Sequence, residues 1–259
     1  KAIMPVHLYG HIADMDRYAA IGEKYGVKIL EDAAQSHLAS LNGRNAGEWG
    51  ICATFSFYPT KNMTTIEGGM VVTNSKDIAE YIMSARNHGL TKTLSQRYSI
   101  GKPWDYDMRE SGYNYRLDEI RSSLGLSQLK RIKKINKLRE RRFEYYNKRL
   151  KGIDHITTPS SSSKNDHAYH LYILKVEPNK KISRDILFKK LLERGIRTSV
   201  HYKPLHMFSA FKKFRKNVAD LNNSSQLYDE IISLPFYPNI SEKQQDYVVR
   251  SIIDIMKNP

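Results

Sequence analysis

The chain reads VKILEDAAQ over residues 27–35. The run VKIL predicts a short buried strand, and it ends in the acid pair Glu31 and Asp32. Residues 14–26 before it predict a helix that Asp14 can cap and Gly26 can end. A helix followed by a strand with polar residues at its carboxyl end is typical of an α/β sheet. In open α/β sheets that end is where ligands bind.

Two further strands are expected close by. The first is ATFSFY over residues 53–58, and the second is MVVTN from Met70. Ser75 then stands where it can cap another helix. The first half of the chain is therefore expected to be α/β, with its polar motifs between the regular elements.

A long helical region is predicted from residue 117 to about residue 150. It carries an apolar stripe at i+3 spacing, made of Leu126, Leu129, Ile132, Ile135 and Leu138. Many lysines and arginines surround that stripe. One hypothesis is a basic module in which residues 130–151 bind nucleic acid or another polyanion, and salt-dependent DNA binding would support it. We favour the other interpretation, a solvated face on a helix that links two domains.

The remainder predicts a smaller α+β domain. HLYILKV over residues 170–176 has the composition of a strand, Ser183 can cap a helix, and Ser241 with Gln244 forms a capping-box pattern before the last helix. We therefore expect three parts: an α/β domain over residues 1–125, a linking helix over 126–150, and a C-terminal small domain over 151–259.

Composition narrows the classes of protein. The 259 residues are 40% hydrophobic, which is enough for a real core. The single cysteine, Cys52, excludes a disulfide framework within the chain and indicates a reducing, cytoplasmic compartment. No apolar stretch approaches the ~20 residues that a membrane span needs, so no membrane partner is expected. The net charge of +15 suits a phosphate-bearing cofactor or substrate.

Lys61 is the candidate for chemistry. It lies within FSFYPTKNMTTIEGG, residues 55–69, in a turn-rich segment after a strand. A lysine forms an imine with an aldehyde only if its amine loses its proton readily, and partial burial favours that. Taken alone, Lys61 is far better explained as a solvated surface residue, which is the ordinary state of lysines.

Asp32 and Gln35 give that lysine a context. An acid at the end of a buried strand can pair with a pyridinium nitrogen, although it can also cap the following turn. Gln35 can reach a ring oxygen or be an ordinary loop amide. An acid after one strand and a lysine after the next is the arrangement that a pyridoxal site requires.

Several motifs carry a family resemblance that runs in register from Pro5 to the final helix. They are PVHLYG (5–10), EDAAQ (31–35), FSFYPTKNMTT with EGG (55–69), RNHG (86–89), GYNYRLDEI (112–120), SLGLSQL (123–129) and VHYKPLH (200–206). Together they resemble the DegT/DnrJ/EryC1/StrS family of sugar aminotransferases.

The resemblance implies a type I aminotransferase fold and pyridoxal 5'-phosphate as cofactor. It makes residues 1–125 a partial cofactor-binding large domain. It implies that Lys61 is the Schiff-base lysine and carries the proton during transamination. Asp32 would pair with the pyridinium nitrogen, Gln35 would contact the ring, and Ser56 would contact the cofactor phosphate. Asn114 would reach the phosphate bound by a neighbouring subunit, which implies a homodimer with shared sites.

The sequence departs from the family pattern in places. Ile66 and Leu38 stand where the family usually has glycine, so we expect those turns to differ, because isoleucine does not easily adopt a positive φ. Histidine replaces the lysine in dehydratases of the family, and Lys61 argues against dehydration. The family's first third has no counterpart in this chain, so an incomplete sheet and half of a phosphate site are expected.

The expected function is therefore pyridoxal-phosphate-dependent transamination of a nucleotide-linked keto-sugar, with an amino acid, glutamate first, as donor. The alternative is a catalytically inert, truncated member without a complete cofactor site. His201 and Tyr202 are the candidate substrate contacts, with a structural histidine as the other interpretation. No metal site is expected, because the histidines lack ligand spacing.

Overall fold

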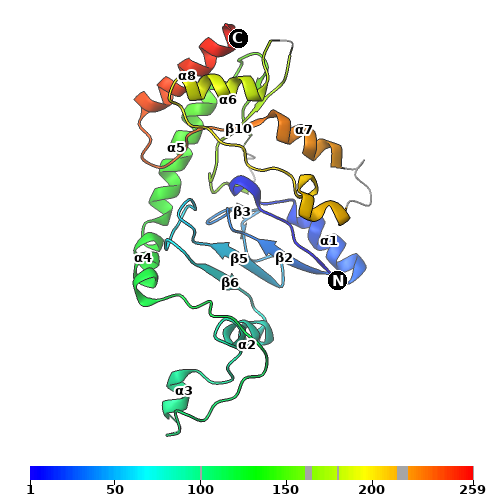
Figure 1. Ribbon diagram of the computed structural model, residues 1–259, viewed down its shortest axis with the longest axis vertical. Coiled ribbons are helices and arrows are strands. Elements are labelled where there is room, and N and C mark those ends of the chain that lie inside the picture. The colour runs from blue at the N-terminus through cyan, green and yellow to red at the C-terminus, as the bar shows by residue number, and fades with distance from the viewer. Residues whose placement is uncertain (100, 161–164, 180, 215–220, 259) are drawn as a thin grey trace. The chain divides into compact units, whose positions relative to one another are not determined.

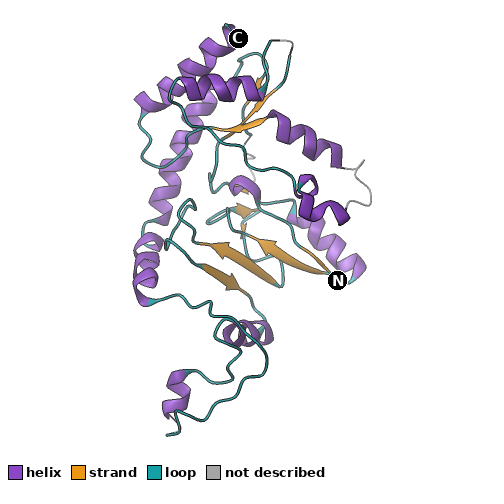
Figure 2. Cartoon of the chain, in the orientation of Figure 1, coloured by secondary structure: helices purple, strands orange, loops and turns teal. Residues whose placement is uncertain are grey.

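The computed structural model describes residues 1–259 except 100, 161–164, 180, 215–220 and 259. The described chain separates into two compact units (Figure 1). One unit holds Lys1–Ile132 and Lys164–Ala168, and the other holds Lys133–Ser163 and Tyr169–Pro259. Helices and strands occur in both, as Figure 2 shows, which confirms a mixed α/β fold.

The first unit is built on a four-stranded sheet. In sheet order its strands are β1 (Ala2–Ile3), β2 (Lys28–Asp32), β5 (Cys52–Ser56) and β6 (Gly69–Val72). Strands β1, β2 and β5 are parallel, and β6 is antiparallel to β5. The three predicted strands are all present. The chain leaves β2 and β5 at the same edge of the sheet, because neighbouring parallel strands end on the same side.

Helix α1 (Met15–Tyr25) precedes β2, as predicted, and Gly26 ends it in the left-handed conformation with φ 61°. The predicted side-chain cap is wrong. Asp14 makes no capping hydrogen bond, and its Oδ2 instead lies 3.9 Å from Nε of Arg17. Packing on β2 holds the helix without that cap: a Cβ at buried Gly22 would lie 3.2 Å from Cγ1 of Ile29.

A small second sheet in this unit includes a segment from much later in the chain. In order, its strands are β4 (Arg44–Asn45), β3 (Ser40–Leu41) and β8 (Asn165–Asp166). Ser40 Oγ donates to Asp166 Oδ2 at 2.6 Å. Ala168 follows, with its N–H donating at 2.8 Å to the carbonyl of Gly10 in the 3-10 turn η1 (Leu8–Gly10). The core cluster here is made of Ile12, Met15, Ile29, Ala39 and Ala168.

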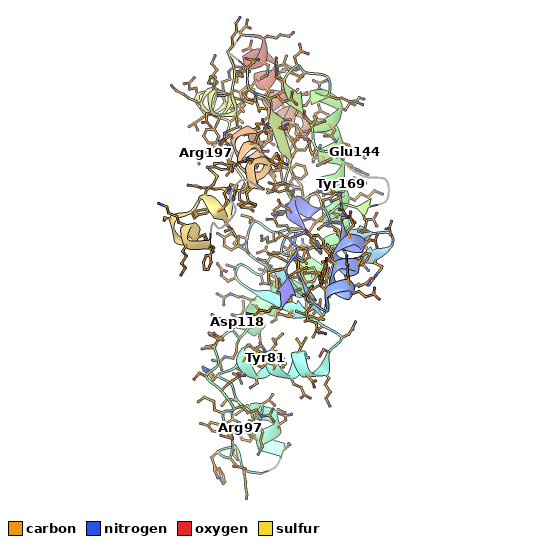
Figure 3. All side chains as sticks on the ribbon, turned by 90° about the vertical axis from the view of Figure 1, so that its right-hand side faces the viewer. Tyr81, Arg97, Asp118, Glu144, Tyr169 and Arg197 are labelled. Carbon is orange, nitrogen blue, oxygen red and sulfur yellow. The ribbon has the colours of Figure 1, made fainter. Side chains whose placement is uncertain are left out.

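We call residues 73–116 the extension. It contains α2 (Lys76–Ala85) and α3 (Leu94–Ser99), and the Oγ of Ser75 accepts the N–H of Ile78, which confirms the predicted cap. Figure 3 labels Tyr81 and Arg97 on it. Its large side chains are mostly at the surface: Tyr81, Tyr98, Trp104, Tyr106, Met108, Tyr113 and Tyr115 are all more than half exposed.

The predicted helical region consists of two helices, α4 (Glu119–Leu129) and α5 (Ile132–Leu150). The expected apolar stripe does not form one buried face, because Leu126 and Leu129 are exposed whereas Ile132 is buried. On α5 the buried positions continue instead through Arg139, Phe143, Tyr146 and Leu150.

The second unit has an antiparallel sheet in the order β10 (Ile231–Ser233), β9 (Ile173–Val176) and β7 (Ile156–Thr157). Around it are α6 (Arg184–Glu193), α7 (Asn222–Glu230), α8 (Glu242–Lys257) and the 3-10 turns η2 (Leu205–Met207) and η3 (Ser209–Phe214). The predicted Ser183 cap and the Ser241–Gln244 capping box are both present. One core cluster joins α5, α6, α8 and the sheet.

Among the described residues, no helix combines the length and the apolarity that crossing a membrane requires.

Candidate active site

Lys61 lies in the loop that leaves β5 and returns to β6, here called the lysine loop (residues 57–68). Its N–H donates to the Tyr58 carbonyl at 2.9 Å, and its side chain is partly buried. Burial lowers the pKa of the Lys61 amine below its ordinary value, and the nearby Asp32 carboxylate opposes this without cancelling it. The amine can therefore lose its proton more readily than that of a surface lysine.

Asp32 ends β2 and pairs in register with Thr54 on β5. Because the two strands are parallel, Asp32 and the start of the lysine loop lie at the same edge of the sheet. Its Oδ1 accepts the N–H of Ala34 at 3.1 Å, so the carboxylate also caps the turn that follows the strand. Its negative charge raises the pKa of Lys61 and so opposes the effect of burial.

Gln35 and Ser56 lie at the same edge. Gln35 is buried, and its Oε1 accepts the N–H of Tyr9 at 2.8 Å, which fixes the orientation of the amide. Ser56 is the last residue of β5, and its Oγ accepts the N–H of Tyr58 at 3.3 Å. That bond uses a lone pair of the hydroxyl and leaves its hydrogen to donate.

The other predicted residues belong to other elements of the fold. Asn114 is exposed on the extension, where it pairs with Asn87 after α2. His201 and Tyr202 belong to the second unit, where His201 Nδ1 and Ser233 Oγ are 2.7 Å apart. Their assignment as substrate contacts rests on the sequence alone.

His37 is a neighbour of Lys61 that the sequence reasoning missed. It is buried, and its ring centroid lies 5.4 Å from that of Phe55 and 6.0 Å from that of Phe57. Burial, reinforced by the Lys61 charge, lowers the pKa of His37 to about 4. The imidazole is therefore neutral near pH 7. Its position two residues after Gln35 in the strand-end motif was the available signal.

A buried pair, Glu31 and His7, was also missed. His7 Nε2 and Glu31 Oε2 are 2.9 Å apart, with both side chains fully buried. The Glu31 carboxylate also accepts N–H groups from Gly47, Trp49 and Gly50 at 2.7–2.8 Å. Burial alone raises the pKa of Glu31, but these hydrogen bonds outweigh it and leave that pKa lowered. The pair fixes the strand residue immediately before Asp32.

The expectation for the turns at Ile66 and Leu38 was wrong. Both residues adopt the left-handed backbone, with φ 69° and 66°. At Ile66 the reason is local: its N–H donates to Thr64 Oγ1 at 2.9 Å, and Thr65 Oγ1 donates to the Glu67 carbonyl at 2.8 Å. These side-chain hydrogen bonds hold a glycine-like turn despite the isoleucine.

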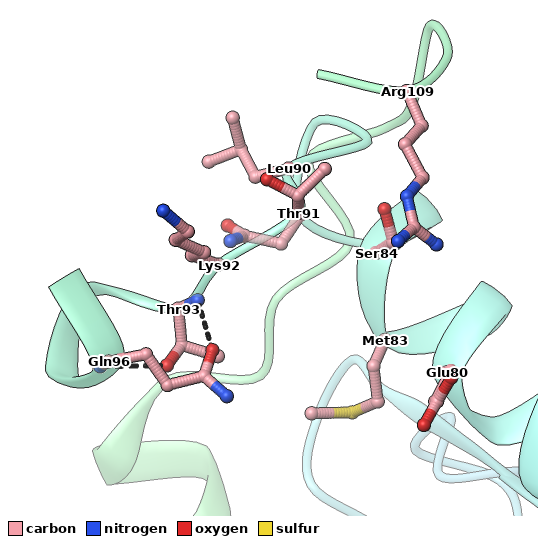
Figure 4. A pocket seen from close by; sticks show the side chains of 10 residues that line it. Glu80, Met83, Ser84, Leu90, Thr91, Lys92, Thr93, Gln96 and Arg109 are labelled. Atoms are coloured by element: carbon pink, nitrogen blue, oxygen red, sulfur yellow. Dashed lines mark hydrogen bonds between the residues drawn. The ribbon is translucent and has the colours of Figure 1, made fainter. Parts of the chain in front are cut away.

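A separate hollow of about 370 Å³ lies in the extension, between α2 and residues 90–96 (Figure 4). Thr93 donates its N–H to Gln96 Oε1 on one side of it, and Ser84 and Met83 lie on the other. None of the predicted site residues lines this hollow, so it is distinct from the strand ends that carry Asp32 and Lys61. Within the described part of the chain, no group of three histidine, cysteine or acidic side chains could hold a metal ion.

A half-buried lysine after one parallel strand and a carboxylate at the end of its neighbour are an arrangement that suits an enzyme dependent on pyridoxal phosphate. Residues 1–253 match the sequence profile of the DegT/DnrJ/EryC1/StrS aminotransferase family, and the chain belongs to that family. Its members use pyridoxal phosphate.

Relatives and solved structures agree with this family. The spore coat polysaccharide biosynthesis protein SpsC of Bacillus subtilis is 36% identical over 260 residues, which is 99% of this chain and 67% of SpsC. The Helicobacter pylori aminotransferase PseC, involved in pseudoaminic acid biosynthesis, superposes with a TM-score of 0.91 at 26% identity, over 100% of this chain and 67% of PseC. The putative sugar aminotransferase Spr1654 of Streptococcus pneumoniae, in its PLP form, gives 0.87 at 25% identity, over 100% and 69%.

The chain spans about two thirds of the length of the curated relatives that it matches. The residues present at the strand ends fit the cofactor chemically. They offer an amine of lowered pKa for the aldehyde, a carboxylate for the ring nitrogen, and an amide and a hydroxyl for polar contacts.

Proposed function

We propose that the protein transfers an amino group from an amino acid, with glutamate as donor, to the keto group of a nucleotide-linked sugar. One observation carries the proposal: Lys61, with its lowered pKa, and Asp32 follow neighbouring parallel strands. Two relatives support the sugar class, since SpsC acts in spore coat polysaccharide biosynthesis and PseC in pseudoaminic acid biosynthesis. The net charge of +15 suits a substrate that bears nucleotide phosphates.

Bound pyridoxal phosphate would supply an aldehyde that accepts the amino group and a ring that takes up the electron pair left when a C–H bond breaks. The chain's residues do the rest. In this proposal, Lys61 would hold the cofactor through Nζ and would carry the proton that moves between two carbon atoms during transamination. Its lowered pKa makes Nζ lose its proton more readily than a solvated lysine does, which suits the role of a base.

The other residues hold the cofactor. The Asp32 carboxylate would keep the ring nitrogen protonated, and the Gln35 amide, fixed by Tyr9, would contact the ring. The Ser56 hydroxyl would donate to the phosphate, and Asn114 would reach the phosphate bound by a second subunit. His201 and Tyr202 would contact the sugar. In this scheme, a type I aminotransferase architecture places the cofactor residues in the large domain and the substrate residues in the C-terminal one.

The cofactor assignment is tested with purified protein and pyridoxal phosphate. We expect a visible absorbance band in the wild type that is lost in Lys61→Ala and kept in Lys76→Ala, because Lys76 is a solvated lysine with an 87% exposed side chain. Borohydride reduction followed by peptide mapping should place the label on Lys61. A wild-type protein without a band would instead support the inert alternative.

The substrate assignment needs a separate assay. Amino transfer from glutamate to a nucleotide-linked keto-sugar should proceed, whereas the same sugar without its nucleotide should react poorly. His201→Ala and Tyr202→Phe should raise KM for the sugar and leave the absorbance band intact. Equal rates with and without the nucleotide would refute the nucleotide-linked class.

We also propose that the protein is a cytoplasmic homodimer. The exposed aromatic side chains of the extension support an interface, because such surfaces are usually covered by a partner. Light scattering should give twice the chain mass, and Tyr115→Glu, at a 70% exposed position, should yield folded monomer. A monomeric wild type at micromolar concentration would refute the dimer.

A further inference from the structure

Asn62, the residue after Lys61, is buried, with only 5% of its surface exposed. Its side-chain amide donates a hydrogen bond to the carbonyl of Ala168, 106 residues later in the chain. We propose that Asn62 is a positioning residue for Lys61: this hydrogen bond holds the peptide that carries the lysine and so fixes where its amine lies. The inference rests on the proposed function only in taking Lys61 as the cofactor lysine.

The lysine loop is fixed on both sides of Asn62. Before it, Lys61 N–H donates to the Tyr58 carbonyl at 2.9 Å. After it, Met63 is buried in a cluster with Phe57 and Ile132. Helix α4 lies directly against the loop, since a Cβ on Gly125 would come within 2.9 Å of the Thr65 methyl group. The Asn62 amide adds a directional anchor between these fixed points, at the residue adjoining the lysine.

An anchor positions a neighbour only if it is itself rigid, and Ala168 is held by its burial, by its own N–H and by the residues that follow it. It is fully buried, and its N–H donates to the Gly10 carbonyl at 2.8 Å. The next two carbonyls, of Tyr169 and His170, each accept from Arg139 Nη1 at 3.2 Å. The carbonyl that Asn62 contacts is therefore presented from a fixed segment.

Losing this anchor has a chemical consequence that can be measured. The Lys61 amine is partly buried, and that burial keeps its pKa below the ordinary value. If the Asn62 side chain releases the loop, the amine gains contact with water and its pKa rises toward the value of a solvated lysine. A purely structural role would change the stability of the loop but not the protonation of Lys61 in the folded protein.

The decisive experiment is labelling with trace acetic anhydride across a pH series, on purified protein without cofactor, read by mass spectrometry at Lys61. Exposed Lys76 serves as the internal reference. In Asn62→Ala we expect the labelling midpoint of Lys61 to rise by at least half a pH unit and its limiting rate to rise about threefold. Asn62→Leu keeps the side-chain volume without the donor and should show the same changes. It takes the place of Asn62→Ala if that variant fails to fold. Asn62→Gln keeps the amide, so the labelling of Lys61 in this variant should return part of the way to that of the wild type.

Ser40→Ala is the matched control. It removes a different hydrogen bond to the same segment, the one to Asp166, and has no direct path to Lys61. It should leave the labelling of Lys61 unchanged. The proposal is overturned if Asn62→Ala and Asn62→Leu label Lys61 with the wild-type midpoint and rate, or if Ser40→Ala shifts them equally.

With cofactor added, Asn62→Ala should keep the visible band, shift its pH midpoint, and lower kcat about tenfold with KM within twofold, because small displacements of a reacting group are costly. A wild type that lacks the band refutes the proposed function. The labelling result still decides the role of Asn62 in that case, so the two failures are distinguishable.

Discussion

Ile66 offers a test of backbone conformation through stability. It has φ 69°, a conformation that strains a residue with a Cβ by about 1–2 kcal/mol and leaves glycine unstrained. Ile66 is 57% exposed. Replacing it by Ala or by Gly removes the same atoms beyond Cβ, so the loss of their contacts cancels when the two variants are compared. Glycine loses about 0.5–1 kcal/mol more backbone entropy on folding. Ile66→Gly should therefore be more stable than Ile66→Ala by roughly 0.5–1 kcal/mol.

The assay is urea unfolding of both variants, with the slope of the transition compared to confirm a common unfolded state. Glu80, exposed within α2, is the control position, because a helix reverses the order and makes alanine more stable than glycine by about 1 kcal/mol. The reasoning is refuted if alanine is the more stable residue at position 66 as well.

Three further predictions concern buried charge and helix ends. Glu31→Ala should lower the free energy of unfolding by about 3 kcal/mol at pH 7. This difference from wild type should shrink as pH falls through the lowered pKa of Glu31, because the carboxylate stabilises the fold only while ionised. A difference in unfolding free energy that is constant from pH 7 to 3 would contradict this. His37, with its pKa lowered to about 4, should contribute stability that is complete above pH 6.5 and lost as pH falls toward 4, and its ring protons in NMR should not titrate above pH 5. A midpoint near 6.5 would show that the ring is solvated. Ser241→Ala removes the α8 cap and should destabilise the protein by about 1 kcal/mol, seen as a lower Tm, whereas an unchanged Tm would contradict the capping box.

Local patterns predicted the regular elements well. The strands around Leu30, Phe55 and Val71 and the helices capped by Ser75, Ser183 and Ser241 all follow from signals within a few residues. That Asp32 and the loop of Lys61 share one edge of the sheet was also predictable, because neighbouring parallel strands end at one edge.

Interactions between distant residues escaped prediction. No spacing rule connects His7 with Glu31 or Asn62 with Ala168, since these partners meet only after the sheet has formed. Ile66 was misjudged for another reason. Hydroxyl groups of Thr64 and Thr65 impose the left-handed turn, and propensity alone does not include such side-chain hydrogen bonds.

The late return of β8 into the first unit bears on how the protein is made. Ala168 completes the core around Ile12 and Met15 and receives the Asn62 hydrogen bond, yet the ribosome adds it 106 residues after Asn62. At about 5–20 residues per second, that interval is roughly 5–20 s. During this time the nascent N-terminal unit lacks one of its strands and the anchor of its lysine loop. Because of the order of synthesis alone, the hydrogen bond that anchors the lysine loop can form only after the chain has begun its second unit.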